Sequence, residues 1–195
     1  MKPVSLPDLE ALTVMDDRLR QVPLDPVSLA RAIAAGEREL ALARAVADPV
    51  RLRRALIWCG TAHRIAGIYE TAEQQLREAL ELARDAGDTS QVIGATIRLA
   101  ELDRCRDAFP TAETLLRLAL KLGEKHGIVV YRDVALQHLG KTMTDAGKAR
   151  AAIPLLEEAL DIRQRKRAPD LVASTEEALA RARDLATSYH PAAIE

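Results

Sequence analysis

Apolar residues recur through most of the chain at intervals of three, four and seven positions, with charged and small polar residues between them. Since an α-helix turns once in about 3.6 residues, these intervals put the apolar side chains on one face of each helix. Proline, glycine and aspartate interrupt the pattern where one helix would end and the next begin. The expected helices cover residues 8–21, 27–47, 49–66, 70–86, 90–107, 110–125, 129–146, 148–167 and 170–188.

The helical pattern repeats at a fixed interval along the chain. Residues 69–88, 109–128 and 149–168 align without gaps. The matching positions are Ala72, Ala112 and Ala152; Leu76, Leu116 and Leu156; and Ala79, Ala119 and Ala159. Small residues also stand twelve positions before each first alanine, at Gly60, Ala100 and Gly140, and would let two helices approach closely. A helical repeat of this length is typical of a solenoid, in which each unit buries its apolar face against its neighbours.

The repeated motif resembles the tetratricopeptide repeat. Its first copy reads W-C-G at Trp58–Gly60 and G-I-Y-E-T-A at Gly67–Ala72, followed by Leu76 and Ala79. The period of about 40 residues exceeds the family's usual length of about 34, as in the longer repeats of kinesin light chains and bacterial regulators. The resemblance implies an all-α fold, a right-handed superhelical solenoid of antiparallel helix pairs, and we expect no strand.

The repeats organise the chain into one expected helical-repeat domain, residues 1–195. Residues 8–47 are interpreted as a degenerate or capping helix pair, because only the end of that segment follows the repeat. The full repeats are residues 48–88, 89–128 and 129–168, and residues 170–188 form a C-terminal capping helix. Gly87 and Gly127 are expected to end the helices before them in the left-handed conformation.

Composition narrows the classes of function. Hydrophobic residues make up 48% of the chain and aromatic residues only 3%, so we expect a core of alanine and leucine. A net charge of −1 argues against a general nucleic-acid binder, and no apolar stretch is long enough to cross a membrane. The first residues, MKPVSLPDLE, do not resemble a signal peptide. Two cysteines without metal-ligand spacing favour the cytoplasm.

Motifs that carry catalysis are not found in the sequence. It contains no glycine-rich phosphate loop and no metalloprotease or nucleophile motif, so we expect no cofactor, no metal and no enzymatic activity. His63 and Cys59 are interpreted as packed structural residues. The basic run R-Q-R-K-R at residues 163–167 is either a surface patch or the positive end of a helix that complements its dipole; the second is favoured.

The first helix of each repeat carries the candidate binding residues. In tetratricopeptide-repeat proteins these helices line the concave surface, so the resemblance assigns one stripe of each helix to that surface. The candidate peptide-binding residues are Arg54, Ile57, Thr61, Arg64, Ile97, Glu101, Arg104, Gln137 and Lys141. Arg64 and Arg104 occupy the same position in successive repeats, so we expect their guanidinium groups to be neighbours and exposed to solvent. Reversal of both charges would then abolish binding and leave the fold intact.

We expect a protein-interaction module that holds a peptide or helix of a partner protein in this groove. The partner would combine an acidic residue with a nearby leucine or isoleucine, because arginine can bind a carboxylate through two hydrogen bonds. A homodimer is compatible with the sequence. Two alternatives stay open: a regulatory or signal-peptide sensor acting on a transcription regulator, and an enzyme with an unrecognised site that uses Arg64, Arg104 and Glu101.

Overall fold

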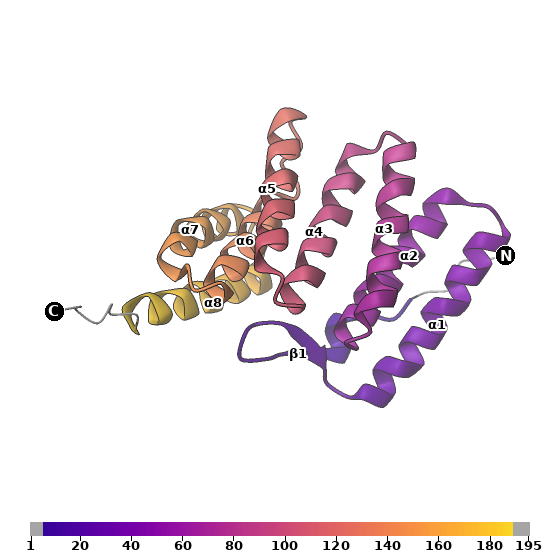
Figure 1. Cartoon of the computed structure of the whole chain (residues 1–195), viewed down its shortest axis with the longest axis horizontal. Coiled ribbons are helices and arrows are strands. Elements are labelled where there is room, and N and C mark those ends of the chain that lie inside the picture. The colour runs from indigo at the N-terminus through magenta and orange to yellow at the C-terminus, as the bar shows by residue number, and fades with distance from the viewer. Residues whose placement is uncertain (1–5, 189–195) are drawn as a thin grey trace. The chain divides into compact units, whose positions relative to one another are not determined.

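The computed structural model describes residues 6–188, and helices dominate this part of the chain (Figure 1). The helices are α1 (Pro26–Ala45), α2 (Pro49–Ile65), α3 (Tyr69–Asp85), α4 (Thr89–Cys105), α5 (Phe109–Lys125), α6 (Arg132–Asp145), α7 (Ala149–Arg165) and α8 (Pro169–Ser188). Consecutive helices pack against each other from α1 to α4 and again from α5 to α8. The predicted helical class is confirmed.

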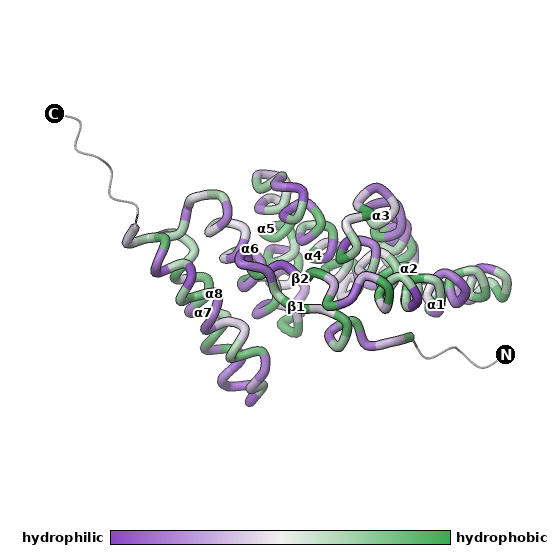
Figure 2. The backbone as a smooth tube through the Cα atoms, turned by 90° about the horizontal axis from the view of Figure 1, so that it is seen from below, coloured by the Kyte–Doolittle hydropathy of each residue, from purple (hydrophilic) through white to green (hydrophobic). Residues whose placement is uncertain are grey.

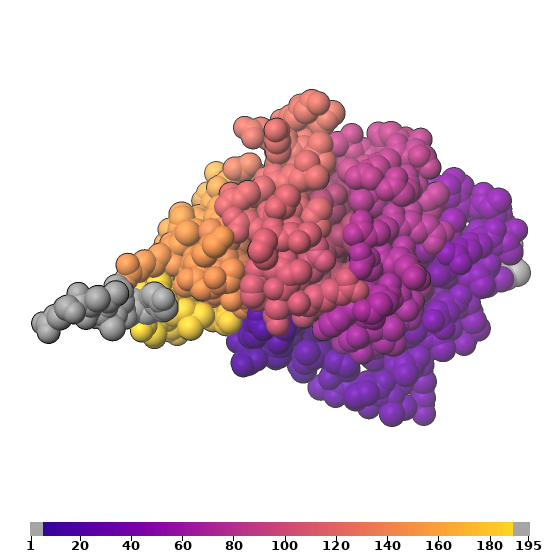
Figure 3. All heavy atoms as spheres, in the orientation of Figure 1, coloured from indigo at the N-terminus to yellow at the C-terminus, as the bar shows by residue number. Residues whose placement is uncertain are grey.

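The chain divides into two compact units. The N-terminal unit ends at Arg106 and contains α1 to α4, and the C-terminal unit starts at Asp107 and contains α5 to α8. In the N-terminal unit each helix packs on the next one along the chain. Side chains fill the spaces between neighbouring ribbons of this unit on the face that Figure 3 shows. Whether the whole chain behaves as one domain stays a prediction.

Helix boundaries follow local sequence signals. The carboxylates of Asp25, Asp48 and Asp88 accept hydrogen bonds from backbone N–H groups at the starts of α1, α2 and α4. Proline stands in the first turn of α1 and of α2, where a missing N–H costs nothing. Each helix from α1 to α7 is followed by a residue of positive φ, and these residues are evenly spaced: Ala47, Gly67, Gly87, Asp107, Gly127, Gly147 and Arg167. The left-handed ends at Gly87 and Gly127 are therefore confirmed.

Close contacts between helices explain the repeated small residues. A methyl group at Gly60 would lie 2.7 Å from Cγ of Leu76, and one at Gly140 would lie 2.5 Å from Cγ of Leu156. These distances leave no room for a side chain, so α2 approaches α3, and α6 approaches α7, at glycine. Ala72, Ala112 and Ala152 are all fully buried, as the repeat predicts.

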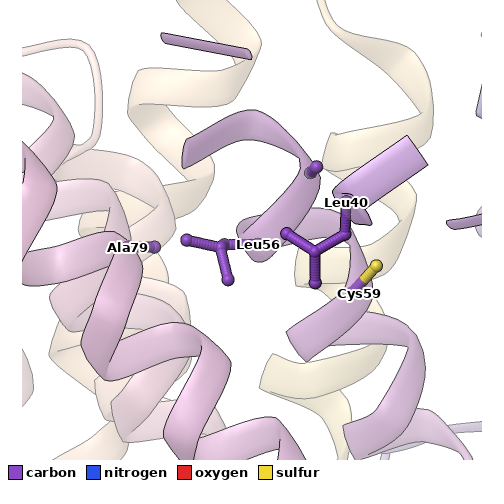
Figure 4. Packing of buried hydrophobic residues seen from close by; sticks show 5 residues of the cluster. Leu40, Leu56, Cys59 and Ala79 are labelled. Carbon is purple, nitrogen blue, oxygen red and sulfur yellow. The ribbon is translucent and has the colours of Figure 1, made fainter. Parts of the chain in front are cut away.

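Alanine and leucine build much of the core. In the N-terminal unit Leu56 of α2 points toward Ala79 of α3, and Leu40 of α1 lies beside Cys59 of α2 (Figure 4). All four residues are buried. Burial raises the pKa of the Cys59 thiol to about 12, so this cysteine is protonated at neutral pH and acts as an apolar residue.

The predicted helix over residues 8–21 is wrong, and so is the expectation of no strand. A 3-10 turn, Glu10–Leu12, leads into β1 (Thr13–Met15), which pairs with β2 (Gln21–Pro23) in an antiparallel hairpin. The Asp16 carboxylate accepts hydrogen bonds from the backbone N–H groups of Arg18 and Arg20 at 2.9 and 2.8 Å, which closes the turn. Local side-chain bonding at aspartate thus outweighs the helical spacing of the leucines.

Candidate functional site

The predicted binding residues of the N-terminal unit lie on one side of α2 and α4, here called the inner face. Most of them are buried. Arg54 is exposed and Ile57 half-buried, whereas the others have little contact with solvent: Thr61, Arg64, Ile97, Glu101 and Arg104. The expectation that Arg64 and Arg104 are exposed is therefore wrong, with exposed fractions of 2% and 0%.

The residues that cover this face precede α1 and are here called the N-terminal segment, residues 6–23. Figure 2, which views the chain from below, shows the hairpin passing in front of the helices of this unit. Arg104 donates to the backbone carbonyls of Arg18 and Leu19 at 2.6 and 3.3 Å. Arg64 donates to the side-chain carbonyl of Gln21 at 2.7 Å. The two arginines thus bind the same hairpin.

Arg64 also has an acidic neighbour within the inner face. Its Nη1 lies 3.8 Å from Oε1 of Glu101 and 3.7 Å from Sγ of Cys105. Burial alone would lower the pKa of Arg64, but the nearby Glu101, Cys105 and Tyr69 together outweigh burial and raise this pKa. Reversing the charge of Arg64 would leave two like charges buried together, so the double reversal expected to spare the fold would disrupt this unit.

A pocket of about 770 Å³ opens beside the covered arginines. Its walls include parts of the inner face and of the N-terminal segment, with Glu39 of α1, and three predicted binding residues line it: Arg54, Ile57 and Thr61. Such a volume lies in the range of ligand-binding clefts. The predicted groove and the observed pocket therefore share the part of the inner face that the hairpin leaves open.

Four arginines line the pocket, and two of them have an acidic partner. Arg51 binds the Glu39 carboxylate with two hydrogen bonds of 2.6 and 2.9 Å, and Arg53 pairs with Asp88 at 3.4 Å. Arg54 and Arg98 are exposed and form no hydrogen bond or ion pair within residues 6–188. Their guanidinium groups are available to a carboxylate from outside the chain.

An apolar wall accompanies these two arginines. Trp58 and Ile57 line the pocket, and the indole N–H of Trp58 donates to the backbone carbonyl of Pro7 at 3.0 Å. Leu9 packs on the buried cluster that includes Ile33 and Ile65. The pocket thus combines cationic groups with an indole ring and aliphatic side chains, and it can accept a ligand that carries both an acidic group and an apolar group.

The candidate residues of the C-terminal unit are also covered. Gln137 and Lys141 of α6 are buried, and the Gln137 amide donates to the Ser174 hydroxyl of α8 at 3.0 Å. Neither side chain is therefore open to a partner in this arrangement of the unit.

A buried charge cluster joins α6, α7 and α8 in the same unit. Arg163 Nε donates to Asp133 Oδ2 at 3.0 Å and its Nη1 to the Thr175 hydroxyl at 2.7 Å, while Lys166 Nζ donates to Asp133 Oδ1 at 2.6 Å. Burial alone would raise the pKa of Asp133, but the hydrogen bonds from Lys166 and Arg163 outweigh it and lower this pKa. The basic run is thus partly structural, since two of its members neutralise a buried carboxylate.

Other candidate groups are structural. His63 is buried, with Nδ1 2.8 Å from Oε1 of Gln75 and Nε2 3.4 Å from Oε1 of Glu37, so it joins three helices. Within the described part of the chain, no three histidine, cysteine or acidic side chains are grouped so that they could hold a metal ion. None of the helices in residues 6–188 is long and apolar enough to span a membrane.

Sequence comparison places a tetratricopeptide repeat at residues 134–170. Among solved structures, BtubC (BKLC) from P. vanneervenii is similar: 23% of residues are identical, 86% of this chain and 77% of that chain are covered, and the TM-score is 0.67. Crystal structures of nearly identical TPR-like repeats of a putative kinesin light chain from Podosopora anserina are similar too. They have 15% and 16% identity, cover 82% of this chain and 79% and 80% of theirs, and give TM-scores of 0.63 and 0.61.

Curated protein sequences show no significant match to this chain. Residues 134–170 match the tetratricopeptide repeat, and the helices of the chain have the fold of TPR-like repeat structures. At these identities the solved structures bear on the fold alone.

Two parts of the pocket were not predicted from the sequence. Arg98 occupies the same repeat position as Trp58, so the repeat itself places both on the same side of successive first helices, and that register could have identified Arg98. The N-terminal segment carried no such signal, because its leucines have the spacing of a helix.

Proposed function

We propose that the chain is a protein-interaction module that binds a peptide or helix of a partner protein at the pocket on the inner face. The observation that carries this proposal is the pair of exposed arginines, Arg54 and Arg98, without acidic partners within residues 6–188, in a pocket that Trp58 and Ile57 also line. Tetratricopeptide-repeat proteins generally serve as interaction scaffolds, and they are typically not enzymes.

The chemistry of the pocket indicates the kind of partner. An aspartate or glutamate would pair with Arg54 or Arg98, and arginine offers such a carboxylate two parallel hydrogen bonds. A leucine or isoleucine nearby would lie against Trp58 and Ile57. We propose that the partner is such an acidic and aliphatic segment, not a nucleic acid or a membrane, and that binding takes place in the cytoplasm. A second copy of the chain could supply the segment.

Within the C-terminal unit, Gln137 and Lys141 stay proposed contact residues only in a form of the unit that exposes them. The same applies to Thr61, Arg64, Ile97, Glu101 and Arg104 of the N-terminal unit, since all seven are buried. The accessible part of the predicted site, the exposed Arg54 and the half-buried Ile57, together with Arg98, is where binding would start.

Fluorescence anisotropy with short labelled peptides tests the proposal. The peptides combine glutamate or aspartate with leucine or isoleucine, and matched peptides carry lysine in place of the acidic residues. The double change Arg54→Glu and Arg98→Glu should weaken acidic-peptide binding at least about tenfold, which corresponds to about 1.4 kcal/mol.

Arg77→Glu is the control, because Arg77 is an exposed residue of α3 that does not line the pocket. This variant should bind as the unchanged protein does. Equal losses in both variants would point to another surface, and equal binding of acidic and lysine peptides would contradict the proposed chemistry.

A further inference from the structure

The N-terminal segment occupies the inner face as a bound peptide would. Three donor side chains of the helices hold it there, and each uses backbone or amide oxygens of the segment as acceptors. Trp58 binds the Pro7 carbonyl at 3.0 Å, Arg64 binds the Gln21 amide at 2.7 Å, and Arg104 binds the Arg18 carbonyl at 2.6 Å. The donors come from α2 and α4 and lie far along the chain from their acceptors.

The start of the segment also has the composition that the pocket favours. Residues 6–10 read L-P-D-L-E, which is two leucines with two carboxylates, and all five line the pocket. Leu9 packs on the apolar cluster that includes Ala62 and Ile65 of α2. This part of the segment therefore places an acidic and aliphatic stretch of chain against the inner face.

The segment has little stability of its own. Its two strands have three residues each, and an isolated hairpin of this size is marginal in water. Leu19 is its buried apolar residue at the turn and has a φ of 55°, a conformation that costs energy for a leucine. Val14 and Met15 are exposed. The order of the hairpin thus depends on its contacts with Arg64 and Arg104.

We propose that the N-terminal segment is an exchangeable occupant of the inner face, and that partners reach Arg64 and Arg104 by displacing it. The proposal rests on the function proposed above for the identity of the competing partner. A carboxylate competes well, because it carries a negative charge and can accept two parallel hydrogen bonds from one guanidinium group, whereas the hairpin offers Arg64 and Arg104 neutral oxygens. The segment would therefore set how much of the inner face a partner can use.

The test uses the full chain and a fluorescent synthetic peptide of residues 6–23 as the probe. Gln21→Ala removes the acceptor of Arg64 and should loosen the chain's own segment, whereas Gln21→Glu should tighten it. The probe is expected to bind Gln21→Ala several-fold more tightly than the unchanged protein, and Gln21→Glu several-fold more weakly. Tryptic cleavage after Arg18 and Arg20, followed by mass spectrometry, should be faster for Gln21→Ala and slower for Gln21→Glu than for the unchanged protein.

Gln91→Ala is the matched control, since Gln91 lines the same pocket from α4 and its side chain makes no hydrogen bond to the hairpin within residues 6–188. It should change neither probe binding nor cleavage. Absence of probe binding to all variants, with equal cleavage rates, would show that the segment is a fixed part of the fold and overturn the proposal. Probe binding that acidic and aliphatic peptides fail to displace would support exchange and contradict the proposed function.

Discussion

The two units cover their candidate binding residues in different ways. In the N-terminal unit a short hairpin lies on Arg64 and Arg104 and leaves a pocket beside them. In the C-terminal unit a full helix, α8, packs on α6 and α7, and Gln137 is bonded to it. Similar helix pairs can therefore be covered by a polar hairpin that leaves a pocket, or by a helix that packs beside a buried charge cluster.

The contacts beneath the two covers differ as well. Asp133 is bound by two cationic side chains, Arg163 and Lys166, and Arg163 also donates to the Thr175 hydroxyl of α8, whereas the hairpin offers backbone carbonyls to Arg104. An ion cluster loses much of its stabilisation when one member is removed, because a buried charge is left behind. A carbonyl acceptor can be replaced by another acceptor. We therefore expect the C-terminal cover to be the firmer of the two.

Removal of the central carboxylate should have the largest effect. Asp133→Ala leaves Arg163 buried without its anion and should lower the free energy of unfolding of the C-terminal unit by about 3–5 kcal/mol. Urea denaturation combined with hydrogen exchange measures the loss unit by unit. Arg165→Ala, in the same run but exposed, is the control and should leave the midpoint unchanged. A loss no larger than that of the control would contradict the structural role of the cluster.

The corresponding change in the N-terminal unit is Arg104→Met. It keeps most of the side-chain volume and removes the donor to the Arg18 and Leu19 carbonyls, so we expect a loss of about 1.5–3 kcal/mol. Backbone amides of residues 13–23 should exchange faster, with little change in α6 to α8. Unchanged exchange in the hairpin would mean that Arg104 does not hold it.

Matched glycine substitutions compare the helix contacts of the two units directly. Gly60→Ala and Gly140→Ala each force a methyl group against a leucine, and the strain of about 1–3 kcal/mol exceeds what alanine gains in helix propensity. We expect similar net losses of about 1–2 kcal/mol in thermal unfolding. Each variant serves as the control of the other, and a neutral result in one unit only would break the equivalence of the contacts.

Acid should affect the two units through different aspartates. The pKa of Asp133 and that of Asp16 are both lowered in the folded protein, since in each case hydrogen bonds outweigh the effect of burial. A lowered carboxyl pKa gives stability that is present above the unfolded value and is lost as the pH falls through the folded value.

Urea midpoints measured from neutral pH down to about pH 3 test this expectation. The urea midpoint of the C-terminal unit should fall less at low pH after Asp133→Asn. Asp16→Asn should have a smaller effect of the same kind on the N-terminal unit, because Asp16 is the more exposed carboxylate. If the urea midpoint changed equally with pH in the two variants, the expected difference between the units would be contradicted.

The repeat made most of the fold predictable from the sequence. Glycine at residues 60 and 140 and leucine at residues 76 and 156 specify close helix pairs, and these pairs are present. The hairpin was not predictable from periodicity, because Leu9, Leu12, Met15 and Leu19 follow helical spacing. Its formation depends on the Asp16 turn and on contacts with Arg64 and Arg104, which are remote in sequence.

The candidate site was predicted less well than the fold. Register placed Arg54, Ile57 and Thr61 on the surface that lines the pocket. It could not show that Arg104 and Glu101 are buried, because their burial comes from the chain folding back over them and from packing between helices. A repeat pattern predicts which residues share a helix face, whereas their exposure depends on which other segments of the chain pack over that face.

Because the left-handed residues are evenly spaced, helix pairs of this chain can be gained or lost as whole units. Every helix from α1 to α7 ends in the same backbone conformation, so the chain leaves each helix in a similar way. A duplication or deletion of one helix pair would begin and end at such turns, so it would join two turns of the same conformation. The apolar face of every remaining helix would keep its orientation. An insertion of one residue inside a helix would instead rotate all later side chains by about 100°. Relatives of this chain would therefore change length by whole helix pairs.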